Sequence, residues 1–157
     1  MKNLLRAGWA LRLTGVALVA MFCIGRVEPQ DPNAEATYGS VKLRAGFTPD
    51  PYTKKLTAGG PILTDKGGVN AHIAKAPDFK LFYTAKNFAL TIRATSEADT
   101  TLLVNLPSGK FVADDDSGGN LNPRLRFPTP QSGRYDIWVG TLGKNTAPAT
   151  LIITELK

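Results

Sequence analysis

The chain has 157 residues, of which 43% are hydrophobic and 20% charged, and its net charge is +6. This length allows one domain with one core and excludes a two-barrel protease or a nucleotide-binding enzyme with a second domain. The proportions are typical of a folded protein rather than a disordered one. The basic residues are dispersed, without a basic stripe interleaved with aromatics, so nucleic-acid binding is not expected.

Residues 1–36 have the composition of a secretory signal followed by a polar linker. Basic residues precede an apolar run over residues 13–24, which is too short to span a bilayer. Cleavage is expected after Gly25 or after Ala36, and an uncleaved N-terminal anchor is the alternative. We therefore expect a periplasmic or secreted protein, with a mature domain over residues 37–157 and no membrane span after removal of the signal.

Beyond the linker, short apolar runs alternate with turn residues. The expected strands are 41–45, 54–58, 71–74, 80–85, 88–94, 101–106, 110–113, 124–127, 135–139 and 150–154. In 88–94 every second residue is apolar, which is the period of a half-buried strand. The turn at Pro107-Ser108-Gly109 makes 101–113 a hairpin.

No window of a dozen residues after the signal has helical periodicity, and turn signals recur at intervals of roughly 8–12 residues. The sequence therefore predicts an all-β fold, a single antiparallel β-sandwich of two packed sheets. The side chains expected between the sheets are Leu90, Ile92, Leu102, Val104, Phe127, Tyr135, Ile137, Val139 and Ile152.

The densest polar feature is the acidic loop over residues 114–120 (DDDSGGN). Three adjacent carboxylates repel one another unless a cation or hydrogen-bond donors compensate their charge. Calcium takes carboxylate and amide oxygens, and alternation in an extended segment places Asp114 and Asp116 on one side. We expect these two residues and Asn120 to bind one calcium ion or, failing that, to be held by backbone amides. The spacing does not fit an EF-hand.

The same loop offers an alternative function. Asp116-Ser117-Gly118-Gly119 resembles the nucleophile segment of trypsin-like serine proteases, and His72, the single histidine, is the one available base. Asp115 stands where those enzymes carry glycine, and the chain is too short for their two barrels. Because of these two differences we expect no catalytic residue. A serine hydrolase that uses Ser117 and His72 is the competing hypothesis.

Residues 135–140 (YDIWVG) alternate between apolar and other side chains. If the apolar side chains on one side face the core, Asp136 and Trp138 face outward. An exposed Trp beside a carboxylate is a platform for a sugar ring or a peptide side chain, so both residues are candidate ligand-binding residues. The alternative is that a neighbouring loop covers the indole, or that it packs under Arg134 or Arg93.

Four segments, residues 99–110, 113–119, 124–127 and 132–140, follow one another in an order that resembles the bacterial pre-peptidase C-terminal domain and its relatives. In those domains a strand after an Asp leads to a tight turn, an acidic loop and a closing Gly-x-Tyr-x-Ile-x-Val strand. The first half of the chain is similar to small exported bacterial proteins with peptidase-related names.

This resemblance implies a jelly-roll-like β-sandwich that assists, targets or tethers rather than catalyses. It adds weight to Asp114 and Asp116 as metal or turn residues. It also implies that Val69 and Ala113 replace a pair of cysteines with a small apolar pair. We therefore expect an exported, non-catalytic binding or accessory domain whose partner is an extracytoplasmic protein or polysaccharide. A purely structural envelope protein is a third hypothesis.

Overall fold

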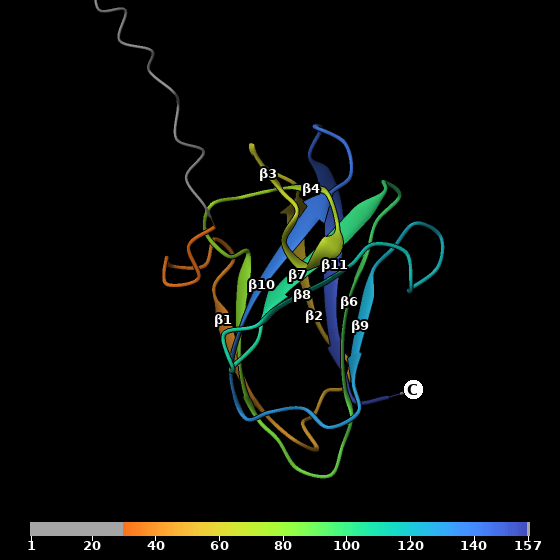
Figure 1. Ribbon diagram of the computed structural model, residues 1–157. Helices are drawn as coiled ribbons and strands as arrows, with labels where there is room; N and C mark the ends of the chain where they lie inside the picture. Colours follow the sequence, from red (N-terminus) through yellow and green to blue (C-terminus); the bar gives the residue numbers. More distant parts are fainter. Residues whose placement is uncertain (1–29, 157) are drawn as a thin grey trace, which may run out of the picture.

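Strands with one apolar face are stable when those faces meet, and here two packed β-sheets bury them against each other (Figure 1). The structure is a computed structural model and describes residues 30–156. The predicted all-β sandwich is confirmed. No helix within these residues has the length and hydropathy needed to cross a membrane. The predicted signal and its first cleavage position, Gly25, lie outside the described residues.

Sheet A is organised around its longest strand, β10. One side of β10 pairs with β5 and, at its far end, with β4, and the other side pairs with β7. Strands β1, β3 and β8 extend the sheet from β5, β4 and β7. The bounds are β1 (Ser40–Arg44), β3 (Ile62–Thr64), β4 (Ala71–Ile73), β5 (Phe79–Thr84), β7 (Thr100–Asn105), β8 (Phe111–Asp114) and β10 (Gly133–Thr141).

Sheet B has the spatial order β2–β11–β6–β9, with every neighbouring pair antiparallel. Its strands are β2 (Tyr52–Ala58), β6 (Leu90–Thr95), β9 (Arg124–Phe127) and β11 (Ala147–Thr154). A short 3-10 turn, η1 (Lys66–Gly68), connects β3 to β4. Among the described residues β6 is the one strand that pairs with β9, which is therefore an edge strand.

Two features of the topology correct the sequence prediction. Strand β3 was not predicted, because three residues are too few for a period to be recognised. Strands β1 and β5 are parallel, with Ser40 opposite Lys80 and Arg44 opposite Thr84, so the sandwich is not wholly antiparallel. A parallel pair needs a long crossover, and here residues 45–78 supply it by passing through β2 in the other sheet.

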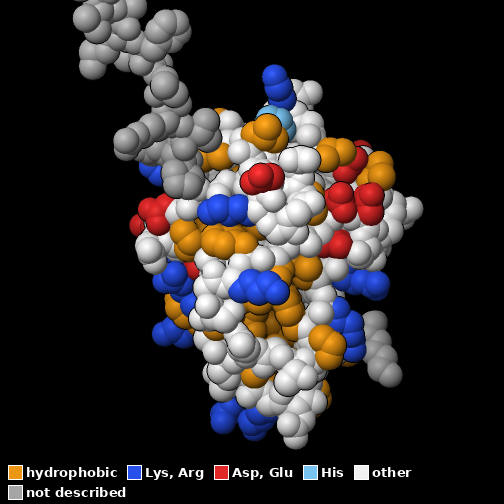
Figure 2. Space-filling model, viewed as in Figure 1, with side chains coloured by type: hydrophobic (Ala, Val, Ile, Leu, Met, Phe, Trp, Pro, Cys, Tyr) orange, Lys and Arg blue, Asp and Glu red, His pale blue; other side chains and the backbone are white. Residues whose placement is uncertain are grey.

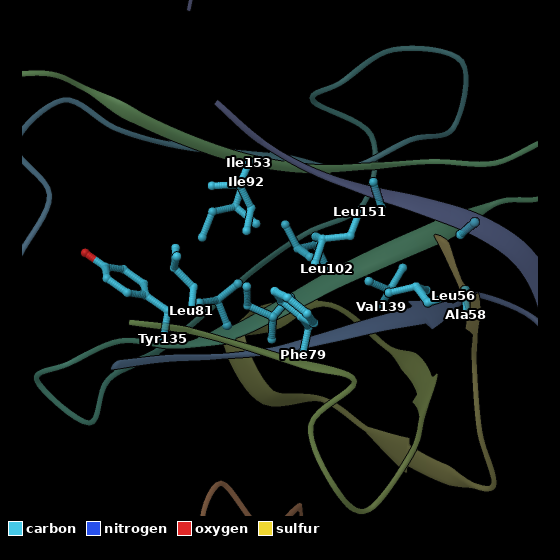
Figure 3. Close-up of a cluster of buried hydrophobic side chains, with 14 of the residues drawn as sticks. Leu56, Ala58, Phe79, Leu81, Ile92, Leu102, Tyr135, Val139, Leu151 and Ile153 are labelled. Atoms are coloured by element: carbon cyan, nitrogen blue, oxygen red, sulfur yellow. The ribbon is translucent and has the colours of Figure 1, made fainter. Parts of the chain in front are cut away.

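The main core lies between the sheets, where Leu81 and Phe79 of sheet A point toward Ile92 of sheet B (Figure 3). Seven of the side chains predicted to lie there are buried in it: Leu90, Ile92, Leu102, Val104, Tyr135, Ile137 and Val139. Phe127 packs against the core but is partly exposed. Ile152 is a wrong assignment, because Leu151 and Ile153 face the core and alternation turns Ile152 to the outer face of sheet B.

A buried carboxylate marks the point where β10 changes partners. Asp78 precedes β5 and is 2% exposed. Its backbone N–H donates to the carbonyl of Ile137 at 2.8 Å, and its Oδ2 accepts the N–H of Val139 at 2.7 Å. The Asp78 carboxylate thus accepts a β10 N–H that lies beyond the last residue pair of β5 and β10. Burial raises the pKa of Asp78 to about 7, although the hydrogen bond from Val139 opposes this shift.

A second, smaller core lies on the outer face of sheet A. It is formed by Ala71, Ile73, Leu103 and Trp138. Ala71 and Ile73 belong to β4, which pairs with the edge strand β3. Turn η1 approaches β8 closely at Gly67, where φ is +75° and a Cβ atom would lie 2.6 Å from that of Ala113. Val69 and Ala113 both pack against this cluster, as apolar residues at those positions would.

Residues 30–37, predicted to be a linker, are packed against the domain from Gln30 onward. Gln30 and Ala36 are buried. Backbone hydrogen bonds join Asp31 to Lys75 and Thr37 to Pro77, each with an N–O distance of 2.9 Å. This segment therefore buries side chains against the sandwich and satisfies some of its backbone groups.

Candidate functional site

The acidic loop is held by hydrogen bonds to its first carboxylate. Asp114 accepts the Ser117 N–H at 3.0 Å and the Arg124 N–H at 2.8 Å through Oδ2, and the Ser117 hydroxyl at 2.5 Å through Oδ1. Asn120 has a φ of 54°, and its carbonyl accepts a hydrogen bond from the Asn122 amide at 2.8 Å. Asp114 thus makes the backbone contacts that were the stated alternative to calcium binding.

The remaining carboxylates of the loop lie near Asp99, a residue that the sequence did not single out. Partial burial raises the pKa of Asp99, and the charges of Asp116 and Asp115 raise it further. Acidic side chains gather over the β8–β9 loop in Figure 2. Within residues 30–156, no group of three or more His, Cys, Asp or Glu side chains is placed to hold a metal ion. Calcium at Asp114, Asp116 and Asn120 stays a prediction.

The predicted platform of Trp138 and Asp136 is not exposed. Both side chains lie on the outer face of sheet A, as alternation predicted, but Trp138 is 0% and Asp136 is 2% exposed. The indole packs in the second core and lies 6.0 Å, between ring centroids, from Phe111. The expectation of an exposed aromatic at this position is therefore wrong, because distant residues around β4 cover it.

Asp136 belongs to a covered ion cluster. Arg134 Nε lies 2.9 Å and Lys80 Nζ 4.0 Å from its Oδ1. Lys80 Nζ also donates to the Ala34 carbonyl at 2.6 Å, and Arg134 donates to the side chain of Asn33 at 3.2 Å. Burial raises the pKa of Asp136, while Arg134 and Lys80 lower it. Its charge is thus compensated within the protein, and the N-terminal segment lies over the cluster.

Ser117 and His72 are not brought together. The Ser117 hydroxyl donates to Asp114, and His72 lies on β4, where it is opposite Thr141 and Leu63. In the described part of the chain no hydrogen bond joins Ser117 to His72. The pairing of nucleophile and base that a serine hydrolase needs is not formed.

Three arginines that the sequence analysis did not single out meet on the outer face of sheet B. Strands β6 and β9 pair so that Arg93 lies opposite Arg124, and Thr91 lies opposite Arg126. Ile92 and Leu125, the residues between them, face the core. Alternation therefore turns all three arginine side chains to the same outer face. We call Arg93, Arg124 and Arg126 the arginine cluster.

The arginine cluster lines a groove of about 540 Å³. Its other lining residues are Pro51, Thr91, Ile152, Thr154 and Leu156, none of which is acidic. Arg126 donates a long hydrogen bond of 3.4 Å to the Thr91 hydroxyl. Among residues 30–156, no carboxylate lies within ion-pair distance of the three guanidinium groups.

Like charges directly opposite each other on paired strands are destabilising, and Arg93 and Arg124 are in this relation. An anion bound between them would remove the repulsion and accept several charge-assisted hydrogen bonds. A partial signal exists in the sequence: Arg124 and Arg126 share a face by alternation, and Arg93 stands at a non-core position of the clearest strand. The pairing of residue 93 with residue 124 depends on the sheet register, which the sequence pattern does not provide.

No family model matches this chain, and no curated protein matches it. Among solved structures it is similar to one described as the crystal structure of Aeromonas hydrophila PliG, a periplasmic lysozyme inhibitor of g-type lysozyme. The identity is 16%, the match covers 77% of this chain and 98% of the other, and the TM-score is 0.39.

Proposed function

We propose that this chain is an exported, non-catalytic binding domain that holds an anionic partner on the outer face of sheet B. The observation that carries the proposal is the uncompensated pair of Arg93 and Arg124 on facing strands, with Arg126 beside them. Guanidinium groups present several N–H donors in a fixed plane, which suits carboxylate, sulfate and phosphate oxygens.

The composition of the groove supports binding rather than catalysis. Its lining residues supply guanidinium groups, threonine hydroxyls and apolar surface from Ile152 and Leu156, but no histidine, cysteine or carboxylate. A general base or an activated nucleophile needs one of these groups, or a lysine, within hydrogen-bond reach of the reacting atom. The arrangement can hold an anion next to an apolar group without acting on it.

The test compares two double variants of the full chain that each lose two positive charges. Arg93→Ser with Arg124→Ser removes the facing pair, and Lys42→Ser with Arg44→Ser removes two exposed cations from β1 on the other sheet. We measure affinity for dextran sulfate over a series of salt concentrations. The arginine variant should bind about tenfold more weakly, which corresponds to about 1.4 kcal/mol, while the control changes little. Equal losses in both variants would mean nonspecific attraction and would overturn the proposal.

Removal of the signal should leave the packed segment over residues 30–37 intact. Cleavage after Ala36 would remove the residues that contact Lys80 and Arg134, so we propose cleavage after Gly25. The intact mass of the exported protein should correspond to a chain that begins at Arg26. A mass that begins at Thr37 would contradict the proposed position, and retention of Met1 would favour the uncleaved anchor.

A fluorophosphonate probe tests the competing serine hydrolase directly. The geometry of Ser117, whose hydroxyl is bound to Asp114, supports an absence of labelling. Labelling of the wild type that disappears in Ser117→Ala would favour the hydrolase over a binding domain.

A further inference from the structure

The backbone of β9 leaves hydrogen-bonding groups without a strand partner. The N–H of Ala94 donates to the carbonyl of Pro123 at 3.3 Å, which makes residues 94 and 123 a hydrogen-bonded pair. Hydrogen-bonded and non-hydrogen-bonded pairs alternate along an antiparallel ladder. The backbone groups of Arg124 and Arg126, which belong to the other kind of pair, therefore point away from β6 toward the free edge.

One of these edge groups is already used within the chain. The Arg124 N–H donates to Asp114, which confirms its direction away from β6. Within residues 30–156, the Arg126 N–H and the carbonyls of Arg124 and Arg126 have no partner strand. One residue of an added strand could bond to both the N–H and the carbonyl of Arg126. A second residue of that strand could donate its N–H to the carbonyl of Arg124.

The two sides of this edge differ in chemistry. On the outer side stand the side chains of Arg124 and Arg126, whereas Leu125 and Phe127 stand on the inner side and remain partly exposed at the margin of the main core. Val112 on β8, an edge strand of the other sheet, is also partly exposed. Figure 2 shows hydrophobic side chains at the surface between Lys and Arg side chains in the middle of this view.

We propose that the anionic partner is an extended segment of a protein that pairs with β9 as an additional strand. This inference rests on the proposed function, and it assigns alternating chemistry to the segment. The first acidic side chain lies on the outer side beside Arg126, and apolar ones lie on the inner side over Leu125 and Phe127. The free backbone groups favour a polypeptide over a polysaccharide, because a strand supplies matching donors and acceptors at the same repeat.

The acidic loop sets the position of such a segment. Asp114, Asp115 and Asp116 precede β9, and Asp114 occupies the edge at Arg124. The negative charges of these three carboxylates would repel an acidic side chain opposite Arg124. The first acidic residue of the segment therefore lies opposite Arg126, and the end of the segment that reaches the acidic loop is uncharged or basic.

The probe is a synthetic peptide of alternating Glu and Val residues in which Ser replaces the Glu that would lie opposite Arg124, and it is made in two N-methylated forms. Residues directly opposite each other on paired strands point their side chains to the same face, so the residue opposite Arg126 is a Glu. We assign the added strand the antiparallel direction that β2, β11, β6 and β9 have toward one another, and in that direction this Glu forms the hydrogen-bonded pair with Arg126. N-methylation of the Glu residues should therefore weaken binding to the full chain about tenfold or more, whereas N-methylation of the Val residues should leave it nearly unchanged.

A second arm removes the amide from the protein. Arg126→Pro and Arg126→Ser both remove the charge, but only the proline removes the edge N–H, and it leaves the hydrogen bonds to β6 intact. The proline variant should bind the unmodified peptide several-fold more weakly than the serine variant does. Thermal melts establish that both variants are folded.

Each outcome separates this inference from the proposed function. Equal binding of the two N-methylated peptides, or no binding of any peptide, would overturn strand pairing. The proposed function would still stand if Arg93→Ser with Arg124→Ser weakened binding to dextran sulfate. If that double variant bound dextran sulfate like the control, the proposed function itself would fail.

Discussion

The outer face of sheet A is partly covered by other segments of the chain, whereas the arginine cluster on the outer face of sheet B is exposed. On each, alternation turns every second side chain away from the core. On sheet A the segment around β4 covers Trp138, and Asp136 is paired with Arg134 and Lys80 beneath residues 33–34. On sheet B the arginine cluster has neither cover nor compensating carboxylate within residues 30–156. The first face adds to stability, and the second is available to a partner.

The largest expected effect tests whether the covered face is a true core. Trp138→Ala should reduce the free energy of unfolding by about 3–5 kcal/mol, because it removes a fully buried aromatic side chain from the second core. Urea unfolding of the wild type and the variant measures this. A loss below about 1 kcal/mol would mean that the cover over sheet A contributes little, and the contrast between the faces would disappear.

The next effect concerns the ionisation of Asp78 in sheet A. Its folded pKa of about 7 exceeds the ordinary 3.8, so the folded state binds more protons between these values and stability falls as pH rises from about 4 to 7. Above pH 7 this cost reaches about 4 kcal/mol, at 1.36 kcal/mol for each pH unit.

Asp78→Asn retains an acceptor for the Val139 N–H and carries no charge. The variant should therefore match the wild type near pH 4 and be more stable than it at pH 8. Thermal melts across this range measure the difference. Parallel pH profiles for the two proteins would show that Asp78 is not buried as described.

A smaller effect is expected at the acidic loop, which joins the two sheets. Asp114→Ala should cost about 1–2 kcal/mol, because two backbone amides and one hydroxyl lose their acceptor. The loss should persist in EDTA. The same melts test calcium: a wild-type midpoint that rises in millimolar calcium, but not in Asp116→Ala, would support the metal site. Identical midpoints in calcium and EDTA would reject it.

The smallest effect on stability is expected at the arginine cluster on the outer face of sheet B. It tests whether this face, unlike that of sheet A, does not contribute to stability. Arg93→Ser should raise the free energy of unfolding by a few tenths of a kcal/mol, since like charges on facing strands repel each other. Lys42→Ser on β1 is the matched control and should change little. A loss of more than about 1 kcal/mol in the arginine variant would give Arg93 a structural role.

The strands were predictable because their signals are local. Alternation and turn residues place 124–127 and the hairpin over 101–113 correctly. The parallel pairing of β1 with β5 was not predictable, since it depends on contacts between residues far apart in the chain. The same limit explains Trp138, whose outward direction follows from alternation but whose burial depends on residues around β4.

The candidate site was less predictable than the fold. Asp114 accepts the backbone N–H groups of Ser117 and Arg124, which are the contacts of the backbone alternative, and its role as a calcium ligand stays a prediction. Arg93 and Arg124 are separated by 31 positions in the sequence, and the register of β6 against β9 alone makes them neighbours. Charge counts along a chain do not detect such a pair.

The packed N-terminal segment also determines how the domain is oriented when it is attached to a support. Asn33 and Ala34 contact sheet A on its outer face, so this part of the N-terminal segment lies on the side of the domain opposite the arginine cluster. A sensor surface or fusion partner that covers this side of the domain would leave the groove open to the solution. Random coupling through lysines would instead include Lys55 on β2 of sheet B and would block part of that face.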